Sequence, residues 1–192
     1  MANSSTSLRN QFFNTPNQLT AARLVLSLVV FVLIPMKAYM SAMIVFLVAA
    51  STDWVDGYWA RRYGQVTKLG RVFDPFVDKI IICGAFIFLV AEPRSGVQAW
   101  MAVVVVGREM LVTALRGFIE QSGGDCSATM SGKLKMVFQC VAVAVSLWTL
   151  SYAAEKVPPW SHGLLHASIW IAIVLTVYSG IGYLRIAAKF FR

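Results

Sequence analysis

Two acidic segments of this chain are the strongest indication of its fold and of a functional site. They are Asp53-Trp54-Val55-Asp56-Gly57-Tyr58-Trp59-Ala60-Arg61 and, after eight further residues, Gly70-Arg71-Val72-Phe73-Asp74-Pro75-Phe76-Val77-Asp78. They follow one apolar stretch and open the next, and they hold four of the nine acidic residues of the chain. An ionised carboxylate within a bilayer is costly unless it is paired or hydrated, so such groups usually have a function. These acids are therefore either solvated beyond a membrane edge or part of a site inside a helical bundle.

The composition around these segments indicates a membrane protein. Of 192 residues, 58% are hydrophobic and only 14% are charged, and the mean hydropathy is +0.66, whereas soluble domains carry roughly 25% charged residues. This excludes a disordered chain, a coiled coil and most soluble folds, and three widely spaced cysteines exclude a disulfide scaffold. The net charge of +8 indicates basic loops that face anionic lipid, so we expect no nucleic-acid partner.

Six apolar stretches are each close to the length of about 20 residues that a transmembrane helix needs. We expect helices at residues 19–36, 39–62, 73–92, 97–120, 131–152 and 164–189. Together they use about 120 positions, which leaves no room for a soluble domain. The sequence thus predicts an all-α integral membrane protein with an N-terminal cytoplasmic or interfacial segment (1–18) and a six-helix transmembrane domain (19–192).

The basic residues give the expected orientation. With the N-terminus in the cytoplasm, all of the 17 Lys and Arg residues except Lys37, Arg94 and Lys156 lie on or toward the cytoplasmic side. Both termini are then cytoplasmic. The polar first 18 residues lead to no convincing signal-peptide cleavage site, so we expect the inner (cytoplasmic) cell membrane, contacts with its lipids, and no organelle targeting.

Helical geometry favours a site over solvated acids. Positions of the first segment that fall within one arc of about 140° on a helix are Asp53, Asp56, Gly57, Ala60 and Arg61. Positions of the second segment that share one stripe at i, i+4 and i+8 are Gly70, Asp74 and Asp78. The two helices run in opposite directions, and the deeper acid of each pair, Asp53 or Asp78, lies about 10–12 Å along its helix from Arg61 or Arg71. We therefore expect both pairs at one level, just below the cytoplasmic surface.

Four carboxylates at one level would repel one another strongly unless something neutralised them. The simplest neutraliser is a hard divalent cation, because oxygen ligands suit Mg²⁺ or Mn²⁺. Two ions bridged by carboxylates are the usual apparatus for displacement at phosphorus. Gly57 and Gly70 lack a Cβ and let a ligand approach the backbone closely. The sequence predicts a site for two ions with these ligands: Asp53, Asp56, Asp74 and Asp78.

The two segments together resemble the signature of the CDP-alcohol phosphatidyltransferases, D-x-x-D-G-x-x-A-R…G-x-x-x-D-x-x-x-D, with every position filled and the spacing intact. Looser motifs narrow the resemblance to the phosphatidylglycerophosphate synthases of that family. These motifs are Pro16-Asn17-Gln18-Leu19-Thr20-Ala21-Ala22-Arg23, Arg108-Glu109-x-x-x-Thr113-x-x-Arg116 and Gly132-Lys133-Leu134-Lys135. The resemblance implies the six-helix fold of the family and a homodimer.

The resemblance also implies an activity for the domain at 19–192. The phosphatidyl group of CDP-diacylglycerol would be transferred to sn-glycerol 3-phosphate for phospholipid synthesis, with the active site toward the cytoplasm. The four aspartates would hold two Mg²⁺ or Mn²⁺ ions, and Asp78 would also accept the proton of the attacking hydroxyl. The CDP-lipid would contact Asn17, Thr20, Gly57, Ala60, Arg61 and Gly70.

Basic residues of the fourth and fifth expected helices are candidates for the phosphate of the acceptor, since Arg gives bidentate and Lys point-charge contacts to phosphate. They are Arg108, Arg116, Lys133 and Lys135. Arg108 lies about 12 Å along the helix from Arg116, so with Arg116 at the cytoplasmic edge it has the expected depth of the aspartates. The alternative for Arg108 is an ion pair with Glu109 or another acid, and for the lysines it is ordinary cytoplasmic charge.

Two other functions stay open. A sibling enzyme could use inositol phosphate, serine or phosphatidylglycerol as acceptor, and the aspartates cannot distinguish these because they act on the shared CDP-lipid. The basic residues disfavour serine and a lipid acceptor, and they disfavour inositol phosphate less securely. The alternative outside enzymes is a small transporter whose acids bind a permeating cation, which the unbroken signature disfavours.

Overall fold

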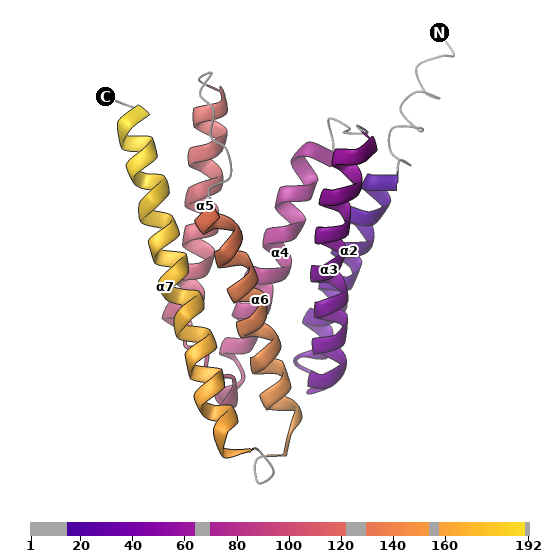
Figure 1. Ribbon diagram of the computed structural model, residues 1–192. Helices are drawn as coiled ribbons and strands as arrows, with labels where there is room; N and C mark the ends of the chain where they lie inside the picture. Colours follow the sequence, from indigo (N-terminus) through magenta and orange to yellow (C-terminus); the bar gives the residue numbers. More distant parts are fainter. Residues whose placement is uncertain (1–14, 64–69, 122–129, 154–157, 191–192) are drawn as a thin grey trace. The chain divides into compact units, whose positions relative to one another are not determined.

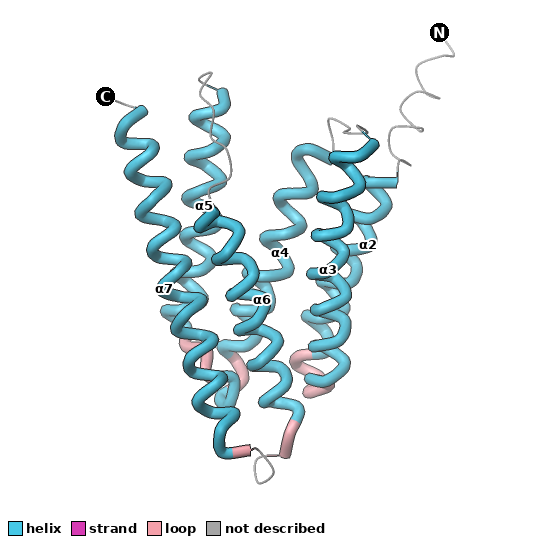
Figure 2. Tube along the Cα trace, viewed as in Figure 1, coloured by secondary structure: helices cyan, strands magenta, loops and turns pink. Residues whose placement is uncertain are grey.

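The computed structural model describes residues 15–63, 70–121, 130–153 and 158–190, without the side chains of residues 15–19, 53–63, 70–75, 78, 120, 130–131, 133 and 189–190. In these ranges the chain is helical and forms no strand (Figures 1 and 2). Its elements are α2 (Thr15–Leu33), α3 (Tyr39–Tyr63), α4 (Gly70–Val90), the 3₁₀ turn η1 (Pro93–Ser95), α5 (Ala99–Gln121), α6 (Met130–Ser151) and α7 (Pro159–Phe190).

Each predicted helix has a counterpart, and the largest differences lie at two N-terminal ends. Helix α7 begins at Pro159 instead of residue 164, and α2 begins at Thr15, directly before Pro16, instead of residue 19. Proline is favoured in the first helical turn because its missing N–H has no partner there and its φ is already helical. The apolar pattern alone therefore placed both starts too late, while the prolines mark them.

The chain divides into two compact units, residues 1–81 and 82–192, and the boundary falls inside α4. In the first unit, α2 and α3 pack against each other across a short turn. Lys37 takes the left-handed conformation there, with φ 58°. The amide of Ala38 donates to the carbonyl of Leu33 at 3.0 Å and that of Lys37 to the carbonyl of Ile34 at 2.9 Å. This pair of hydrogen bonds is a Schellman turn, which satisfies carbonyls at the helix end.

Buried positions of the first unit alternate in steps of three and four residues. They are Thr20, Arg23, Ser27 and Val30 on α2, Ile34 in the turn directly after it, and Tyr39, Ala42, Phe46 and Ala49 on α3. This spacing of about 3.5 residues is typical of helices that pack side by side with a slight left-handed twist. The predicted helix pair at 19–36 and 39–62 thus has a defined packing face over its described side chains.

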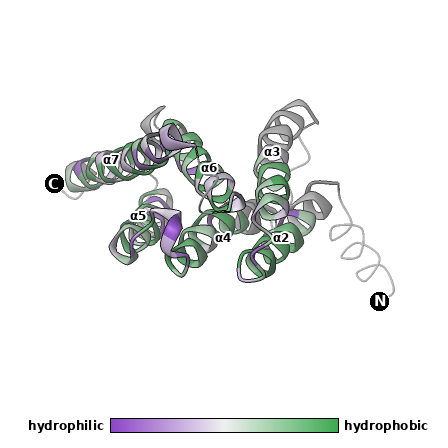
Figure 3. Cartoon of the chain, turned by 90° about the horizontal axis from the view of Figure 1, so that it is seen from below, coloured by the Kyte–Doolittle hydropathy of each residue, from purple (hydrophilic) through white to green (hydrophobic). Residues whose placement is uncertain are grey.

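In the second unit, α7 packs against both α5 and α6. The buried face of α7 includes Ser168, Thr176 and Ser179, whereas Val174 and Tyr178 are exposed. Figure 3 shows hydrophobic residues along much of the helical surface. Large apolar residues such as Ile169 and Ile173 are buried beside these polar ones, so apolar side chains occur on both the inner and the outer face of α7. An apolar outer face is unlike the polar surface of a soluble bundle and is typical of a membrane protein.

Two helices are long and apolar enough to cross a membrane, over Leu134–Ser151 and Pro159–Ala188. Shorter apolar stretches occupy Thr20–Leu33, Tyr39–Thr52 and Lys79–Val90. Arg108 and Glu109 interrupt the apolar sequence of α5. The all-helical class is confirmed for the described residues, and the six membrane spans stay a prediction.

The turn after η1 brings the backbone against α7. Gly96 has φ 73°, and a Cβ added there would lie 3.0 Å from Cδ1 of Ile169 and 3.3 Å from the side chain of Leu165. The hydroxyl of Ser95 donates to the carbonyl of Leu89 at 2.6 Å, and the hydroxyl of Ser146 donates to the carbonyl of Ser95 at 3.0 Å. Only glycine fits this conformation and this close approach without strain.

Replacing Gly96 with alanine tests this turn. We expect Gly96→Ala to lower the free energy of unfolding by about 1–2 kcal/mol, because the left-handed backbone and the contact with Ile169 are both unfavourable for a Cβ. The measurement is the apparent Tm of the purified protein in detergent. Gly163→Ala is the matched control, since a Cβ at this position in α7 meets nothing within 4 Å. Equal Tm values for the two variants would contradict the assignment.

Candidate functional site

The acidic signature lies on two helices, as predicted. Asp53 and Asp56 belong to α3, and Asp74 and Asp78 belong to α4. Because the backbone is helical, each pair falls on one side of its helix. Their side chains lie outside the described ones, so the two-metal site stays a prediction. Other predicted site residues also lie outside the described side chains, so their roles stay predictions. They are Asn17, Gly57, Ala60, Arg61 and Gly70 for the CDP-lipid and Lys133 for the acceptor phosphate.

Thr20 is the predicted CDP-lipid residue whose side chain the structure describes. It is buried on α2, on the same face as Arg23. The hydroxyl of Ser27, one turn further on, donates to the carbonyl of Arg23 at 2.7 Å. The face of α2 that packs against α3 is therefore polar near its N-terminal end and apolar beyond it.

A buried cluster of charges joins α5 to α6. The carboxylate of Glu109 accepts hydrogen bonds from Nη1 of Arg108, at 3.2 Å, and from Nζ of Lys135. The side chains of Arg108, Glu109 and Lys135 are only 8%, 9% and 5% exposed. The alternative weighed for Arg108, an ion pair with Glu109, is thus present, and the same carboxylate also holds a second predicted phosphate-binding residue.

Helix α7 contributes two polar residues that the sequence did not single out. Nη2 of Arg108 donates to the hydroxyl of Ser179, and Nη2 of Arg116 donates to the hydroxyl of Tyr183 at 2.6 Å. The ring centre of Tyr183 lies 5.5 Å from Cζ of Arg108 and 5.1 Å from Cζ of Arg116, within cation–π range. A signal for both residues existed in the sequence, because Thr176, Ser179 and Tyr183 follow one another in steps of three and four residues within an apolar stretch and so share one face of a helix.

The cluster has more positive than negative charge. Among the described side chains that contact one another in it, Arg108, Arg116 and Lys135 face the single carboxylate of Glu109, which leaves a formal charge of three minus one, or +2. Nε of Arg108 and Nε of Arg116 are buried without a hydrogen-bond partner in the described part of the chain. Buried charges need partners, so this arrangement suits an anionic ligand with about two negative charges.

Comparisons with known proteins agree with the signature. The family model of the CDP-alcohol phosphatidyltransferases matches residues 13–178. A CDP-diacylglycerol–glycerol-3-phosphate 3-phosphatidyltransferase of Bacillus subtilis (strain 168) is 34% identical over 188 residues, which cover 89% of this chain and 93% of the relative. Proteins of the same name from Shigella flexneri and Salmonella typhimurium are also 34% identical, over 91% of this chain and 95% of theirs. The chain belongs to the CDP-alcohol phosphatidyltransferase family.

A solved structure shares the fold. It is the crystal structure of a Mycobacterium tuberculosis phosphatidylinositol phosphate synthase with CDP-DAG bound, which matches with a TM-score of 0.63 over 97% of this chain and 94% of the other. The sequence identity is 20%, so this likeness concerns the fold alone. The predicted CDP-alcohol phosphatidyltransferase fold is thereby confirmed.

Removing the charge of Glu109 tests the buried cluster. Glu109→Gln keeps the shape of the side chain but leaves Arg108 and Lys135 without their counter-ion, so we expect the free energy of unfolding to fall by about 3 kcal/mol. The measurement is again the apparent Tm in detergent. Adding Lys135→Met to that variant removes one uncompensated cation and should recover part of the loss. An unchanged Tm in Glu109→Gln would show that the carboxylate is not needed.

The control for this variant is Arg94→Gln. Arg94 is exposed, and its Nη1 donates to the carbonyl of Tyr152 at 3.1 Å. An exposed hydrogen bond of this kind contributes about 1 kcal/mol or less. The Tm of Arg94→Gln should therefore stay close to that of the parent protein.

Proposed function

We propose that this chain transfers the phosphatidyl group of CDP-diacylglycerol to sn-glycerol 3-phosphate and releases CMP and phosphatidylglycerophosphate. The relatives named for this reaction support the proposal, because they are 34% identical over about nine-tenths of the chain. The observation that carries the choice of acceptor is the buried basic cluster of α5 and α6 with its formal charge of +2.

Charge separates the candidate acceptors. A phosphate monoester carries about −1.5 to −2 near pH 7, which matches the excess of the cluster. Phosphatidylglycerol is a phosphodiester with a single negative charge, and serine has no net charge, so either would leave buried cations uncompensated. Inositol phosphate has the same charge as glycerol phosphate, and here the names of the relatives favour glycerol phosphate.

The aspartates of α3 and α4 are the proposed ligands of two Mg²⁺ or Mn²⁺ ions. The donor set fits these ions, since four carboxylates supply only oxygen ligands. When bound, the ions neutralise the charge of the diphosphate and of the departing CMP. The CDP-lipid is expected to contact Asn17, Thr20, Gly57, Ala60, Arg61 and Gly70.

Asp78 is the proposed base. The primary hydroxyl oxygen of glycerol 3-phosphate bonds to the lipid-side phosphorus, and the bond from that phosphorus to the bridging oxygen breaks. CMP leaves with the bridging oxygen, and the carboxylate of Asp78 takes the hydroxyl proton. The phosphate of the acceptor is held by basic side chains through charge-assisted hydrogen bonds. These are Arg108, Arg116, Lys133 and Lys135.

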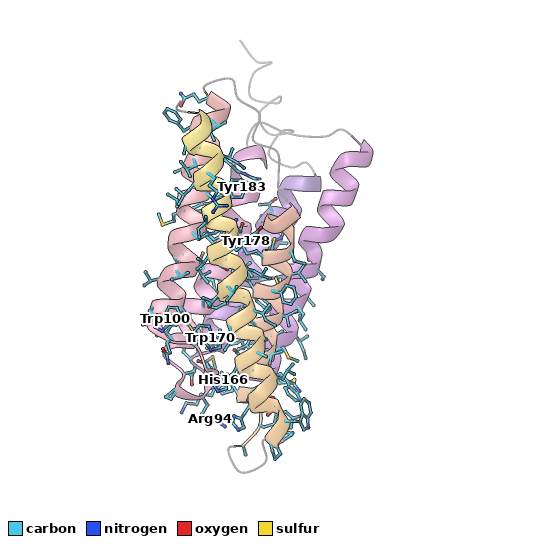
Figure 4. All side chains as sticks on the ribbon, turned by 60° about the vertical axis from the view of Figure 1, so that its left-hand side comes forward. Arg94, Trp100, His166, Trp170, Tyr178 and Tyr183 are labelled. Atoms are coloured by element: carbon cyan, nitrogen blue, oxygen red, sulfur yellow. The ribbon has the colours of Figure 1, made fainter. Side chains whose placement is uncertain are left out.

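The proposed setting is the inner cell membrane, with six transmembrane helices, both termini and the active site toward the cytoplasm, and a homodimer as in the family. The proposed division is an N-terminal cytoplasmic or interfacial segment (1–18) and a catalytic domain (19–192). Two features support this. Large apolar side chains are exposed, and within the second unit Arg94 lies toward the opposite end from Tyr183 and its arginine partners (Figure 4).

An acceptor panel tests the proposed function. Purified protein with CDP-diacylglycerol and Mg²⁺ should release CMP with glycerol 3-phosphate, and at least about tenfold more slowly with serine or phosphatidylglycerol, because a change of one hydrogen-bonded charge is of this size. Release with inositol phosphate should also be slower, an expectation that rests on the names of the relatives and not on charge. EDTA should abolish the release and added Mg²⁺ should restore it. Faster release with inositol phosphate would assign the sibling activity, and cation transport without CMP release would assign a transporter.

Changing Asp78 to asparagine tests the base. We expect kcat, measured at saturating Mn²⁺, to fall by about 10²- to 10⁴-fold, the usual contribution of a general base. Mn²⁺ should still bind, as followed by electron paramagnetic resonance, because three of the four proposed carboxylate ligands remain. Substantial turnover in Asp78→Asn would remove Asp78 from this role. The matched control is Glu92→Gln, an acid-to-amide change just beyond the C-terminal end of α4, which should leave kcat unchanged.

A further inference from the structure

Tyr183 brings its ring against two arginines of a neighbouring helix. It is 3% exposed on α7 and packs with Val112 and Ile119 of α5. Cζ of Arg108 and Cζ of Arg116 lie 5.5 Å and 5.1 Å from its ring centre. Figure 4 places Tyr183 on the C-terminal half of α7, beyond Tyr178. One side chain therefore contacts both arginines of the candidate phosphate site.

Holding two arginines near one another needs a compensating attraction. Their charges repel, and both side chains are largely removed from solvent, where the repulsion is less screened. The face of an aromatic ring is negative and attracts a guanidinium. The hydroxyl of Tyr183 adds a charge-assisted hydrogen bond from Arg116. Tyr183 thus offsets repulsion without adding a second carboxylate, which would lower the formal charge of the cluster from +2 to +1.

The hydrogen bonds of the two arginines fall on their terminal nitrogens. Arg108 donates from Nη1 to the carboxylate of Glu109 and from Nη2 to the hydroxyl of Ser179. Arg116 donates from Nη2 to the hydroxyl of Tyr183. Nε of both arginines is left buried and unpartnered in the described part of the chain. Because a guanidinium is planar and rigid, fixing its terminal nitrogens also fixes the direction of its Nε–H donor.

We propose that Tyr183, with Ser179 one turn earlier on α7, is a positioning residue that orients Arg108 and Arg116 for a phosphate group. The identity of this phosphate, that of glycerol 3-phosphate, rests on the proposed function. Tyr183 acts through the arginines and does not contact the reacting atoms. Helix α7, which lies outside the signature, would then set the affinity for the acceptor.

The first test separates the two substrates. We expect Tyr183→Leu to raise the KM for glycerol 3-phosphate about tenfold, the size of a lost hydrogen bond to a charged group, with the KM for CDP-diacylglycerol changed by less than about twofold. Arg108→Ala should show the same split. Tyr183→Phe keeps the ring and loses the hydroxyl, so its KM for glycerol 3-phosphate should lie between those of the parent protein and Tyr183→Leu.

The second test measures anion binding without turnover. Inorganic phosphate should raise the Tm of the parent protein, since a ligand that binds only the folded state stabilises it. A chloride solution of equal ionic strength controls for screening. Tyr183→Leu should lose the phosphate-dependent rise. Tyr178→Leu is the matched control, because Tyr178 lies on the same helix with its side chain exposed, and it should keep both the rise and the kinetic constants.

These outcomes decide the proposal separately from the proposed function. The positioning role of Tyr183 is overturned if Tyr183→Leu keeps both the parent KM for glycerol 3-phosphate and the phosphate-dependent rise in Tm. It is also overturned if only kcat falls in this variant, or if phosphate does not raise the Tm of the parent protein. A parent protein without glycerol 3-phosphate-dependent CMP release would overturn the proposed function, and loss of the rise in Tyr183→Leu would still support positioning. If Tyr183→Leu does not fold, Tyr183→Phe decides by the same two measurements.

Discussion

The carboxylate of Glu109 ties α5 to α6, and the charge arrangement of the second unit depends on it. It contacts Arg108 of its own helix and Lys135 of the next one inside the bundle. An isolated cation at either position would carry a desolvation penalty of several kcal/mol. Because Glu109 pairs with both Arg108 and Lys135, it lowers the penalty for each, and these three side chains together still carry one net positive charge. Glu109 accepts from Nη1 of Arg108, and Nη2 of the same arginine donates to the hydroxyl of Ser179 on α7.

The local sequence was enough to predict the helices and part of the site. Apolar stretches of membrane-spanning length gave the six helices, and the i, i+8 spacing gave Arg108 and Arg116 on one helix. The contacts of Ser179 and Tyr183 were not predictable in this way, because their partners are 71 and 67 residues distant in sequence. Periodicity assigns a residue to a face of its own helix, and the choice of partner depends on how helices approach one another.

The same limit applies to the acidic signature. Spacing assigns the aspartates to one side of each helix, but their separation across two helices depends on packing that periodicity does not encode.

The buried polar residues of α7 contact both of the helices that pack against it. Thr176 accepts a hydrogen bond from Gln139 of α6 at 2.9 Å, one turn before Ser179 meets Arg108. A continuous polar line on α7 therefore joins the contact that pairs α6 with α7 to the charged cluster.

The length of α7 constrains how the protein sits in a lipid layer. Its 32 residues measure about 48 Å at 1.5 Å per residue, whereas the hydrocarbon core of a bilayer is about 30 Å thick. Even at a tilt of 40°, the upper end of the usual range, the helix would rise through about 37 Å. If α7 crosses the bilayer as proposed, tilting alone cannot place its whole length in the hydrocarbon core, and at least one terminal turn lies among the headgroups. A thinner bilayer would expose more of it, so lipid thickness becomes a variable that acts on the helix bearing Tyr183.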